Sequence, residues 1–152
     1  SYGQVSKLDD ASILLAFCHV DFDEEIMKMF KIEHIINSAN NLINYFRHKY
    51  NDNNINLIGR YPDDKYYDGH IWVICSLALA QFYIYLSNIS EEYINLRDVA
   101  DKIFIFIVSI NANLDLSEQF DLNFHKMLSA EKLTWNYSEL VKFVHIFNKS
   151  LN

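Results

Sequence analysis

Cysteine is scarce in this chain of 152 residues, with only Cys18 and Cys75 present. Each lies in an apolar run that predicts a helix, so we expect two buried free thiols, because free cysteine is among the most buried residue types. Two cysteines placed in this way do not predict a disulfide framework. The six histidines are scattered, without a His-x-x-x-His pair, and we expect no metal site.

Basic residues are also few: 13 Lys and Arg face 20 Asp and Glu, and the formal net charge is −7. This balance argues against a general binder of nucleic acid or of anionic membranes, which would need a basic face. It is compatible with a neutral ligand such as a sugar. No signal peptide is visible at the N-terminus, which begins with Ser1, so we expect a processed product or a fragment of a longer chain.

Long hydrophobic runs are absent as well. Residues 71–86 are nearly all apolar, but the run is shorter than the roughly 20 residues that a membrane span needs. It also carries a central Gln81. A helix buried on most of its surface is therefore favoured over the alternative of a membrane span.

Apolar periodicity predicts about five helices within a single domain over residues 1–152. The acidic pair Asp9-Asp10 marks the start of the first, in the apolar run 13–20. The others are expected at 32–50, 71–86, 90–110 and 136–149. Residues 103–110 are rich in β-branched side chains and could also form a strand, but length favours a helix. We expect a polar break at 51–56 and an irregular segment at 111–135.

Glycine and proline are rare, and they are concentrated in one place. Two of the three glycines and the only proline fall in "GRYPDDKYYDGHIW", residues 59–72. A flexible linker would be rich in Gly and Ser and would not carry four aromatic rings. A second loop, "LSEQFDLNFHKMLSAEKLTW" at residues 116–135, also places carboxylates beside aromatic residues. Long loops in compact domains are usually functional, so the two together predict a binding site.

These two loops resemble motifs of glycoside hydrolase family 15, the glucoamylases. Residues 59–74 follow the family pattern G-R-Y-P-E-D-x-Y-Y-x-G-N-P-W-F-L without a gap. Residues 117–121 match S-E-Q-[YF]-D, and residues 128–137 match L-S-A-x-D-L-T-W-S-Y. The start, Leu8 to Leu15, is similar to the family's D-A-[ST]-x-L-L segment. The resemblance covers essentially the whole chain and corresponds to the C-terminal part of the family's catalytic domain.

The resemblance implies an all-α fold, the C-terminal portion of an (α/α)6 barrel, with the active site in a pocket formed by loops at one end. The implied reaction is hydrolysis of terminal α-1,4-glucosidic bonds of starch, glycogen or maltooligosaccharides, releasing β-D-glucose with inversion. It requires no cofactor, no nucleic acid and no membrane. The chain would need the N-terminal half of the barrel as its partner. Family members are commonly secreted or vacuolar.

The resemblance also implies roles for individual residues. Glu118 stands at the position of the catalytic general base, and Arg60 and Asp64 stand at positions that hydrogen-bond the sugar in the first subsite. Asp63 stands where the family usually has Glu, one methylene longer. The tryptophans, Trp72 and Trp135, match aromatic positions around the pocket, and we expect Tyr66 and Tyr67 to pack within the loop.

Two departures from the family pattern bear on activity. His70-Ile71 replaces the family's Asn-Pro, which removes a fixed backbone angle before the following helix. The family's general acid lies in a Glu-Glu motif upstream of this chain. The pairs Glu24-Glu25 and Glu91-Glu92 have a different order and context, so we expect the isolated chain to lack the acid and to be inactive or nearly so.

Two other interpretations stay open. The chain could be a degenerate glucoamylase-like remnant that binds glucan, or binds nothing, without catalysis; the change at His70-Ile71 favours this slightly. It could also be a helical interaction domain unrelated to sugars, which the gap-free loop match makes the weakest of the three.

Overall fold

The structure is a computed structural model, and it describes residues 9–20, 31–110 and 113–151. Leu8, Glu24 and Glu25, named above, lie outside the described residues. The helices are α1 (Ser12–Cys18), α3 (Ile32–Tyr50), α4 (Val73–Ile89), α5 (Leu96–Ser109) and α6 (Thr134–Lys149), with short 3₁₀ turns at Tyr66–Gly69 and Glu91–Tyr93. The described chain is mostly helical, as the sequence predicts for an all-α part of a helical barrel.

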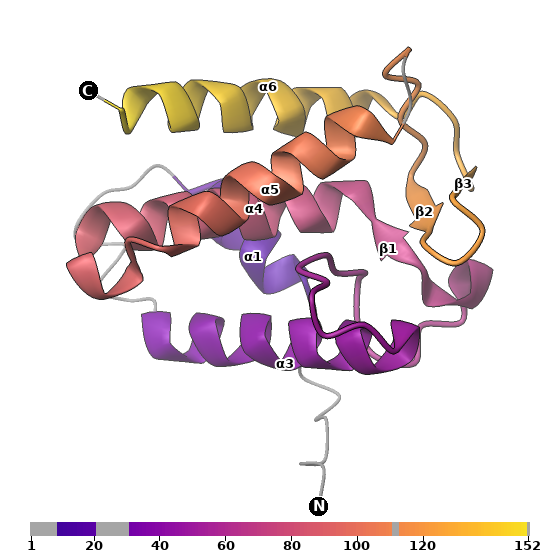
Figure 1. The fold of residues 1–152 in the computed structure, drawn as a ribbon, viewed down its shortest axis with the longest axis horizontal. Helices are drawn as coiled ribbons and strands as arrows, with labels where there is room; N and C mark the ends of the chain where they lie inside the picture. The colour runs from indigo at the N-terminus through magenta and orange to yellow at the C-terminus, as the bar shows by residue number, and fades with distance from the viewer. Residues whose placement is uncertain (1–8, 21–30, 111–112, 152) are drawn as a thin grey trace, which may run out of the picture.

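Helix α4 forms the centre of the molecule. Helices α1, α5 and α6 all pack against it, and Figure 1 shows α6 on one side of α4 and α3 on the other. Leu77, Ala78 and Phe82 have no exposed surface, because the helix is apolar around its whole circumference. Within the described residues, no helix combines the length and the apolarity needed to cross a membrane.

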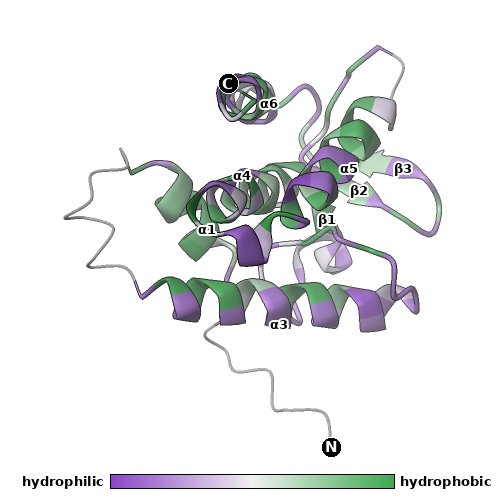
Figure 2. Cartoon of the chain, turned by 60° about the vertical axis from the view of Figure 1, so that its left-hand side comes forward, coloured by the Kyte–Doolittle hydropathy of each residue, from purple (hydrophilic) through white to green (hydrophobic). Residues whose placement is uncertain are grey.

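Helix α3 buries a single apolar stripe. Its buried side chains recur at intervals of three and four residues: Ile35, Ala39, Leu42, Ile43 and Phe46. Figure 2 shows the hydrophobic side of α3 turned toward α1 and α4 and its hydrophilic side turned away. The helix ends where Asn51 adopts a left-handed conformation with φ of 51°, which asparagine tolerates better than most residues. The predicted range 32–50 is confirmed.

A small antiparallel sheet joins the two polar loops. Strand β1 (Ile71–Trp72) pairs with β2 (Gln119–Asp121), which pairs in turn with β3 (Lys126–Leu128). In this register Trp72 lies opposite Gln119, and Gln119 lies opposite Leu128. The prediction of an irregular segment at 111–135 is therefore wrong for these strands. Strands of two or three residues are too short to show an alternating pattern in the sequence.

Several predicted helix boundaries also need correction. Helix α1 spans Ser12–Cys18 rather than 13–20, and α4 ends at Ile89 rather than at residue 86. Helix α4 begins at Val73 rather than at residue 71, because residues 71–72 pair with β2. Ser90 caps only the short turn Glu91–Tyr93, where its Oγ accepts from the Glu92 backbone N–H at 3.3 Å, and α5 begins at Leu96. Helix α6 begins two residues earlier than predicted, at Thr134. Residues 103–109 are helical, which confirms the choice of helix over strand.

Candidate active site

Arg60 and Asp64 form a two-pronged ion pair in the first loop. Arg60 Nε donates to Asp64 Oδ2 at 2.8 Å, and Arg60 Nη2 donates to Asp64 Oδ1 at 2.8 Å. The Asp64 side chain is 2% exposed, whereas that of Arg60 is 32% exposed. The backbone N–H of Tyr66 also donates to Asp64 Oδ1, at 2.9 Å. The buried carboxylate thus fixes the direction of an arginine that reaches solvent.

The titration of the pair follows from this geometry. Burial acts to raise the pKa of Asp64, but the hydrogen bonds from Arg60 and from the Tyr66 backbone outweigh it and hold this pKa below its usual value. The hydrogen bond to Asp64 raises the pKa of Arg60, and the charges of Asp64 and Glu118 act in the same direction. The guanidinium therefore lies within electrostatic range of both carboxylates.

Three aromatic rings surround the guanidinium of Arg60. Its Cζ lies 4.5 Å from the ring centroid of Trp72 and 5.2 Å from those of Tyr61 and Tyr66. Such distances allow cation–π attraction. The rings of Tyr66 and Trp72 are 6.0 Å apart, and those of Tyr66 and Tyr67 are 4.8 Å apart. Both tyrosines nevertheless remain exposed, so the expectation that they pack within the loop is met only in part. Trp72 is 9% exposed and forms a wall behind the arginine.

Glu118 lies immediately before β2, and hydrogen bonds connect it to the first loop. Ser129 Oγ donates to Glu118 Oε2, and the hydroxyls of Ser129 and Tyr66 are 2.9 Å apart. Because the single Ser129 proton goes to the carboxylate, Tyr66 must donate to Ser129. Two hydroxyls in series thus point their protons toward Glu118 and connect its carboxylate to the first loop.

Main-chain contacts fix the position of Glu118. Its N–H donates to Ala130 O at 2.8 Å, and its carbonyl accepts from the N–H of Val73 at 3.2 Å. Asn136, at the start of α6, donates to the carbonyl of Ser117 at 2.8 Å. Ser129 itself has a left-handed backbone with φ of 67°, a strained conformation that clusters at functional sites. The segment that carries Glu118 is therefore held by α4, by α6 and by the turn that follows β3.

The sequence motifs did not single out Ser129 or Gln119 as functional residues. Gln119 is fully buried, and its Oε1 and Nε2 have no hydrogen-bond partner among the described residues. Within the same part of the chain, Nε1 of Trp72, which lies on the neighbouring strand, has none either. Unsatisfied buried polar atoms are rare and often mark a functional position. The sequence did offer a signal, because both residues fall inside the matched motifs. Gln119 directly follows Glu118 in the S-E-Q-[YF]-D motif, and Ser129 is the serine of the L-S-A motif.

Two predicted site residues lie apart from this network. Asp63 is exposed, and its carboxylate accepts from the Tyr45 hydroxyl on α3 at 3.3 Å. Its neighbour Asp64, not Asp63, forms the ion pair with Arg60. Trp135, near the start of α6, is 60% exposed and lies outside the hydrogen bonds and ring contacts described above. The structure thus brings together four of the six predicted residues: Arg60, Asp64, Trp72 and Glu118.

His70, which departs from the family pattern, ties the two loops together behind the site. Its Nδ1 lies 3.0 Å from the Tyr50 hydroxyl, and its Nε2 lies 3.7 Å from Asp121 Oδ2. Asp121 belongs to β2, so the contact between His70 and Asp121 joins the same two segments that the pairing of β1 with β2 joins. Among the described residues, no group of three His, Cys, Asp or Glu side chains is arranged to hold a metal ion.

The described chain is a mostly helical protein in which two loops bring a carboxylate, Glu118, close to an arginine–aspartate pair and its surrounding aromatic rings. The model of the glycosyl hydrolases family 15 matches residues 1–145, and the chain belongs to this family. Curated proteins that match include an uncharacterized glycosyl hydrolase of Methanocaldococcus jannaschii. It is 28% identical over 153 residues, which cover 95% of this chain and 23% of the relative. The chain thus spans less than a quarter of that relative's length. No solved structure matches the chain.

Proposed function

We propose that this chain supplies the base side of a glucoamylase active site. In this proposal Glu118 is the general base, and Arg60 and Asp64 bind the terminal glucose of an α-1,4-glucan. The observation that carries the proposal is the hydrogen-bonded path Glu118–Ser129–Tyr66, which links the second loop to the ring cage around Arg60.

The Arg60–Asp64 pair keeps donors free for a sugar. An arginine has five N–H donors, and the fork to Asp64 uses two of them. The remaining three N–H groups can meet vicinal hydroxyls in a fixed plane. Asp64 Oδ1 already accepts from Arg60 and from the Tyr66 N–H, and the Asp64 side chain is 2% exposed, so Asp64 contributes by fixing the arginine. The pair would therefore bind glucose as a preset unit through Arg60, and the exposed ring of Tyr66 would face the apolar C–H side of the sugar.

The proposed reaction needs a second carboxyl group. In an inverting glycosidase a general acid lies about 6.5–9.5 Å from the base and leaves room for the attacking water. We assign this acid to the upstream half of the barrel. An apolar surface where that half would pack is available on α6, where Val141 is 69% and Val144 is 41% exposed.

The test compares glucose release by two proteins: this chain alone, and a polypeptide in which the upstream catalytic segment of a family 15 enzyme precedes this chain, here called the joined polypeptide. We expect release from maltooligosaccharides only from the joined polypeptide, with β-glucose as the first product in NMR spectra. Loss of a general acid typically costs about 10²–10⁴ in rate. Rapid glucose release by this chain alone would contradict the assignment of the acid.

The inactive-remnant alternative predicts a different result. A remnant would give no glucose in either protein. Acarbose, a mimic of the flattened cationic transition state, then separates a retained site from a collapsed one: titration of the joined polypeptide should show binding that Arg60→Ala abolishes. Absence of both hydrolysis and acarbose binding would leave the proposed function without support.

A further inference from the structure

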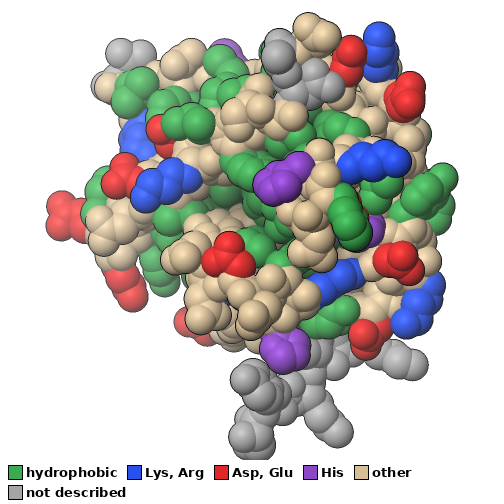
Figure 3. Space-filling model, turned by 45° about the vertical axis from the view of Figure 1, so that its right-hand side comes forward, with side chains coloured by type: hydrophobic (Ala, Val, Ile, Leu, Met, Phe, Trp, Pro, Cys, Tyr) green, Lys and Arg blue, Asp and Glu red, His purple; other side chains and the backbone are tan. Residues whose placement is uncertain are grey.

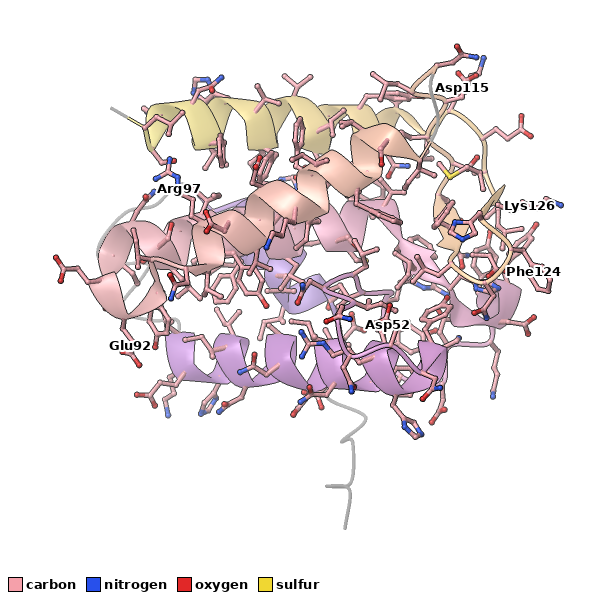
Figure 4. The ribbon with its side chains drawn as sticks, viewed as in Figure 1. Asp52, Glu92, Arg97, Asp115, Phe124 and Lys126 are labelled. Atoms are coloured by element: carbon pink, nitrogen blue, oxygen red, sulfur yellow. The ribbon has the colours of Figure 1, made fainter. Side chains whose placement is uncertain are left out.

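A hollow with a volume of about 520 Å³ lies outside the candidate active site. Three segments enclose it: residues 50–57 after α3, the middle of α5, and the turn between β2 and β3. Asp52 lies between α3 and α5, and Phe124 and Lys126 lie at the outer edge of the hairpin (Figure 4). Neither α1 nor α6 contributes a residue to its lining. The hollow is therefore separate from the exposed side of α6 on which we propose that the upstream half packs.

The lining combines an apolar floor with planar polar groups. Leu57 and Ile103 are buried at its base, and the rings of Phe106 and His125 form one side. The rim carries carboxylate, amide and ammonium groups: Asp52, Asn54, Asn123 and Lys102. On the hairpin side of the molecule, apolar side chains reach the surface between charged ones of both signs (Figure 3). Opposed charges and several amides suit a neutral, polyhydroxylated ligand better than an anion.

The walls of the hollow are held in place before any ligand arrives. Arg47 donates to the Ile55 carbonyl and to Asn56 Oδ1, both at 2.8 Å, which fixes the 50–57 segment. On the hairpin, Asp121 Oδ1 accepts from the Asn123 N–H at 2.8 Å. The His125 ring lies 6.2 Å from that of Phe120. Preorganised walls reduce the ordering cost of binding.

The hollow and the rings around Arg60 lie on different sides of one small sheet. Phe120 packs against Phe106, at a centroid distance of 5.7 Å, and against His125, both of which line the hollow. Its neighbour Gln119 lies opposite Trp72, and the guanidinium of Arg60 lies over the ring of Trp72. Successive side chains in a strand point to opposite faces. A ligand in the hollow therefore leaves the Arg60 side open.

We propose that this hollow is a second carbohydrate site, which holds a segment of α-glucan on the outer wall of the protein. The choice of glucan as the sugar rests on the proposed function, whereas the polyol character of the ligand rests on the lining. A polymer held here would raise the local concentration of chain ends near the catalytic loops.

The test is calorimetric titration of the full chain with maltoheptaose. We expect His125→Asn, which removes the ring and keeps a residue that tolerates the left-handed backbone with φ of 49°, to weaken binding by about 3- to 10-fold, the effect of one lost contact. Asn54→Ala, in an exposed loop position, should act similarly. Lys126→Ala is the matched control, because Lys126 is exposed on the same hairpin but does not line the hollow, and should have no effect.

Unchanged maltoheptaose affinity in both hollow variants, or an equal loss in Lys126→Ala, would overturn the second site. Absence of any maltoheptaose binding would overturn it too. Arg60→Ala separates this inference from the proposed function: it should abolish acarbose binding in the joined polypeptide and leave the hollow's contribution to maltoheptaose binding intact. Binding that depends on His125, together with no glucose release by the joined polypeptide, would support the hollow and contradict the proposed enzyme.

Discussion

At the scale of single residues, Arg60 organises the site. One side of its guanidinium is fixed by Asp64 and three rings stand around it. Lysine could not replace it, because an ammonium group is a point charge without a planar fork. The same loop carries two adjacent aspartates, Asp63 and Asp64. Only Asp64 is buried, and only Asp64 accepts the two hydrogen bonds of the arginine.

The first prediction concerns the stability that Asp64 contributes. Asp64→Asn should lower the free energy of unfolding by about 1.5–3 kcal/mol at neutral pH, the usual worth of hydrogen bonds to charged groups. The pKa of Asp64 is lowered by folding, so this contribution is complete above the unfolded value of about 3.9 and is lost as the pH falls through the folded value. Urea denaturation of both proteins at neutral pH and below about pH 3 measures the difference.

Asp63→Asn is the control for that measurement. Asp63 is exposed, and its substitution should change stability by less than about 0.5 kcal/mol. We expect the stability difference between the native protein and Asp64→Asn to shrink toward acid pH. A difference that grows toward acid pH would contradict the account of the Arg60–Asp64 pair.

The second prediction concerns the thiols. Burial raises the pKa of Cys18 to about 12 and raises that of Cys75 as well. Both side chains are buried, and reactivity requires an accessible thiolate. Ellman's reagent at mildly alkaline pH should therefore label neither cysteine in the folded chain and both in urea. Rapid labelling of one thiol in the folded protein would show that its surroundings open in solution.

At the scale of elements, three strands of two or three residues decide where the site forms. They place Trp72 directly opposite Gln119, although 46 residues of the chain, 73–118, separate the two. The first loop reaches this sheet through a close approach at Gly59. A Cβ there would lie 2.5 Å from the His70 carbonyl oxygen and 2.5 Å from Phe46 Cζ. The glycine thus lets the loop, α3 and the start of β1 meet.

The third prediction tests that approach. Gly59→Ala should destabilise the fold by about 1–3 kcal/mol, because an added methyl group in a filled space forces its neighbours to shift. Lys65→Ala, exposed in the same loop, should have a small effect. Thermal unfolding of the native chain and of the two variants measures the difference in stability. Equal melting temperatures for Gly59→Ala and the native chain would contradict the prediction, because they would show that the neighbours of residue 59 make room for a methyl group at little cost.

Helices were predictable from the sequence where their apolar stripes are long, as in α3, and where they are apolar throughout, as in α4. The sheet was not, because its strands are shorter than one repeat of a reliable alternating pattern. For the site, motif resemblance identified Glu118, Arg60 and Asp64. It did not reveal that Ser129 and Tyr66 connect them, because a hydroxyl in a loop has no distinctive spacing. The hollow near His125 arises from three separate segments and has no local sequence pattern.

At the scale of the whole molecule, the described chain leaves part of α6 unpartnered. Val141 and Val144 are exposed on this helix, whereas Phe143 is buried and stacks on Phe104 and Phe147 at 5.0 and 5.7 Å. One side of α6 therefore packs on the rest of the chain. The other presents apolar side chains of the kind that mark interaction surfaces, and we assign that side to the upstream half of the barrel.

The fourth prediction uses Val141→Lys. In this chain alone the substitution should change stability by no more than about 0.5 kcal/mol, because the position is 69% exposed. In the joined polypeptide it should cost about 1–3 kcal/mol, because the charge would be buried against the upstream half. Asn40→Lys, at an exposed polar position of α3, should behave alike in both proteins. An equal effect of Val141→Lys in both would place the upstream half elsewhere.

The most direct test of the account is the rate of glucose release from maltooligosaccharides by the joined polypeptide carrying Glu118→Gln. The matched control is Glu131→Gln, an exposed carboxylate in the turn that follows β3. With Glu118 as the general base, Glu118→Gln should lower the rate by about 10²–10⁴-fold, and Glu131→Gln should leave it unchanged. Equal rates in the two variants would contradict the assignment of Glu118 and with it the proposed function.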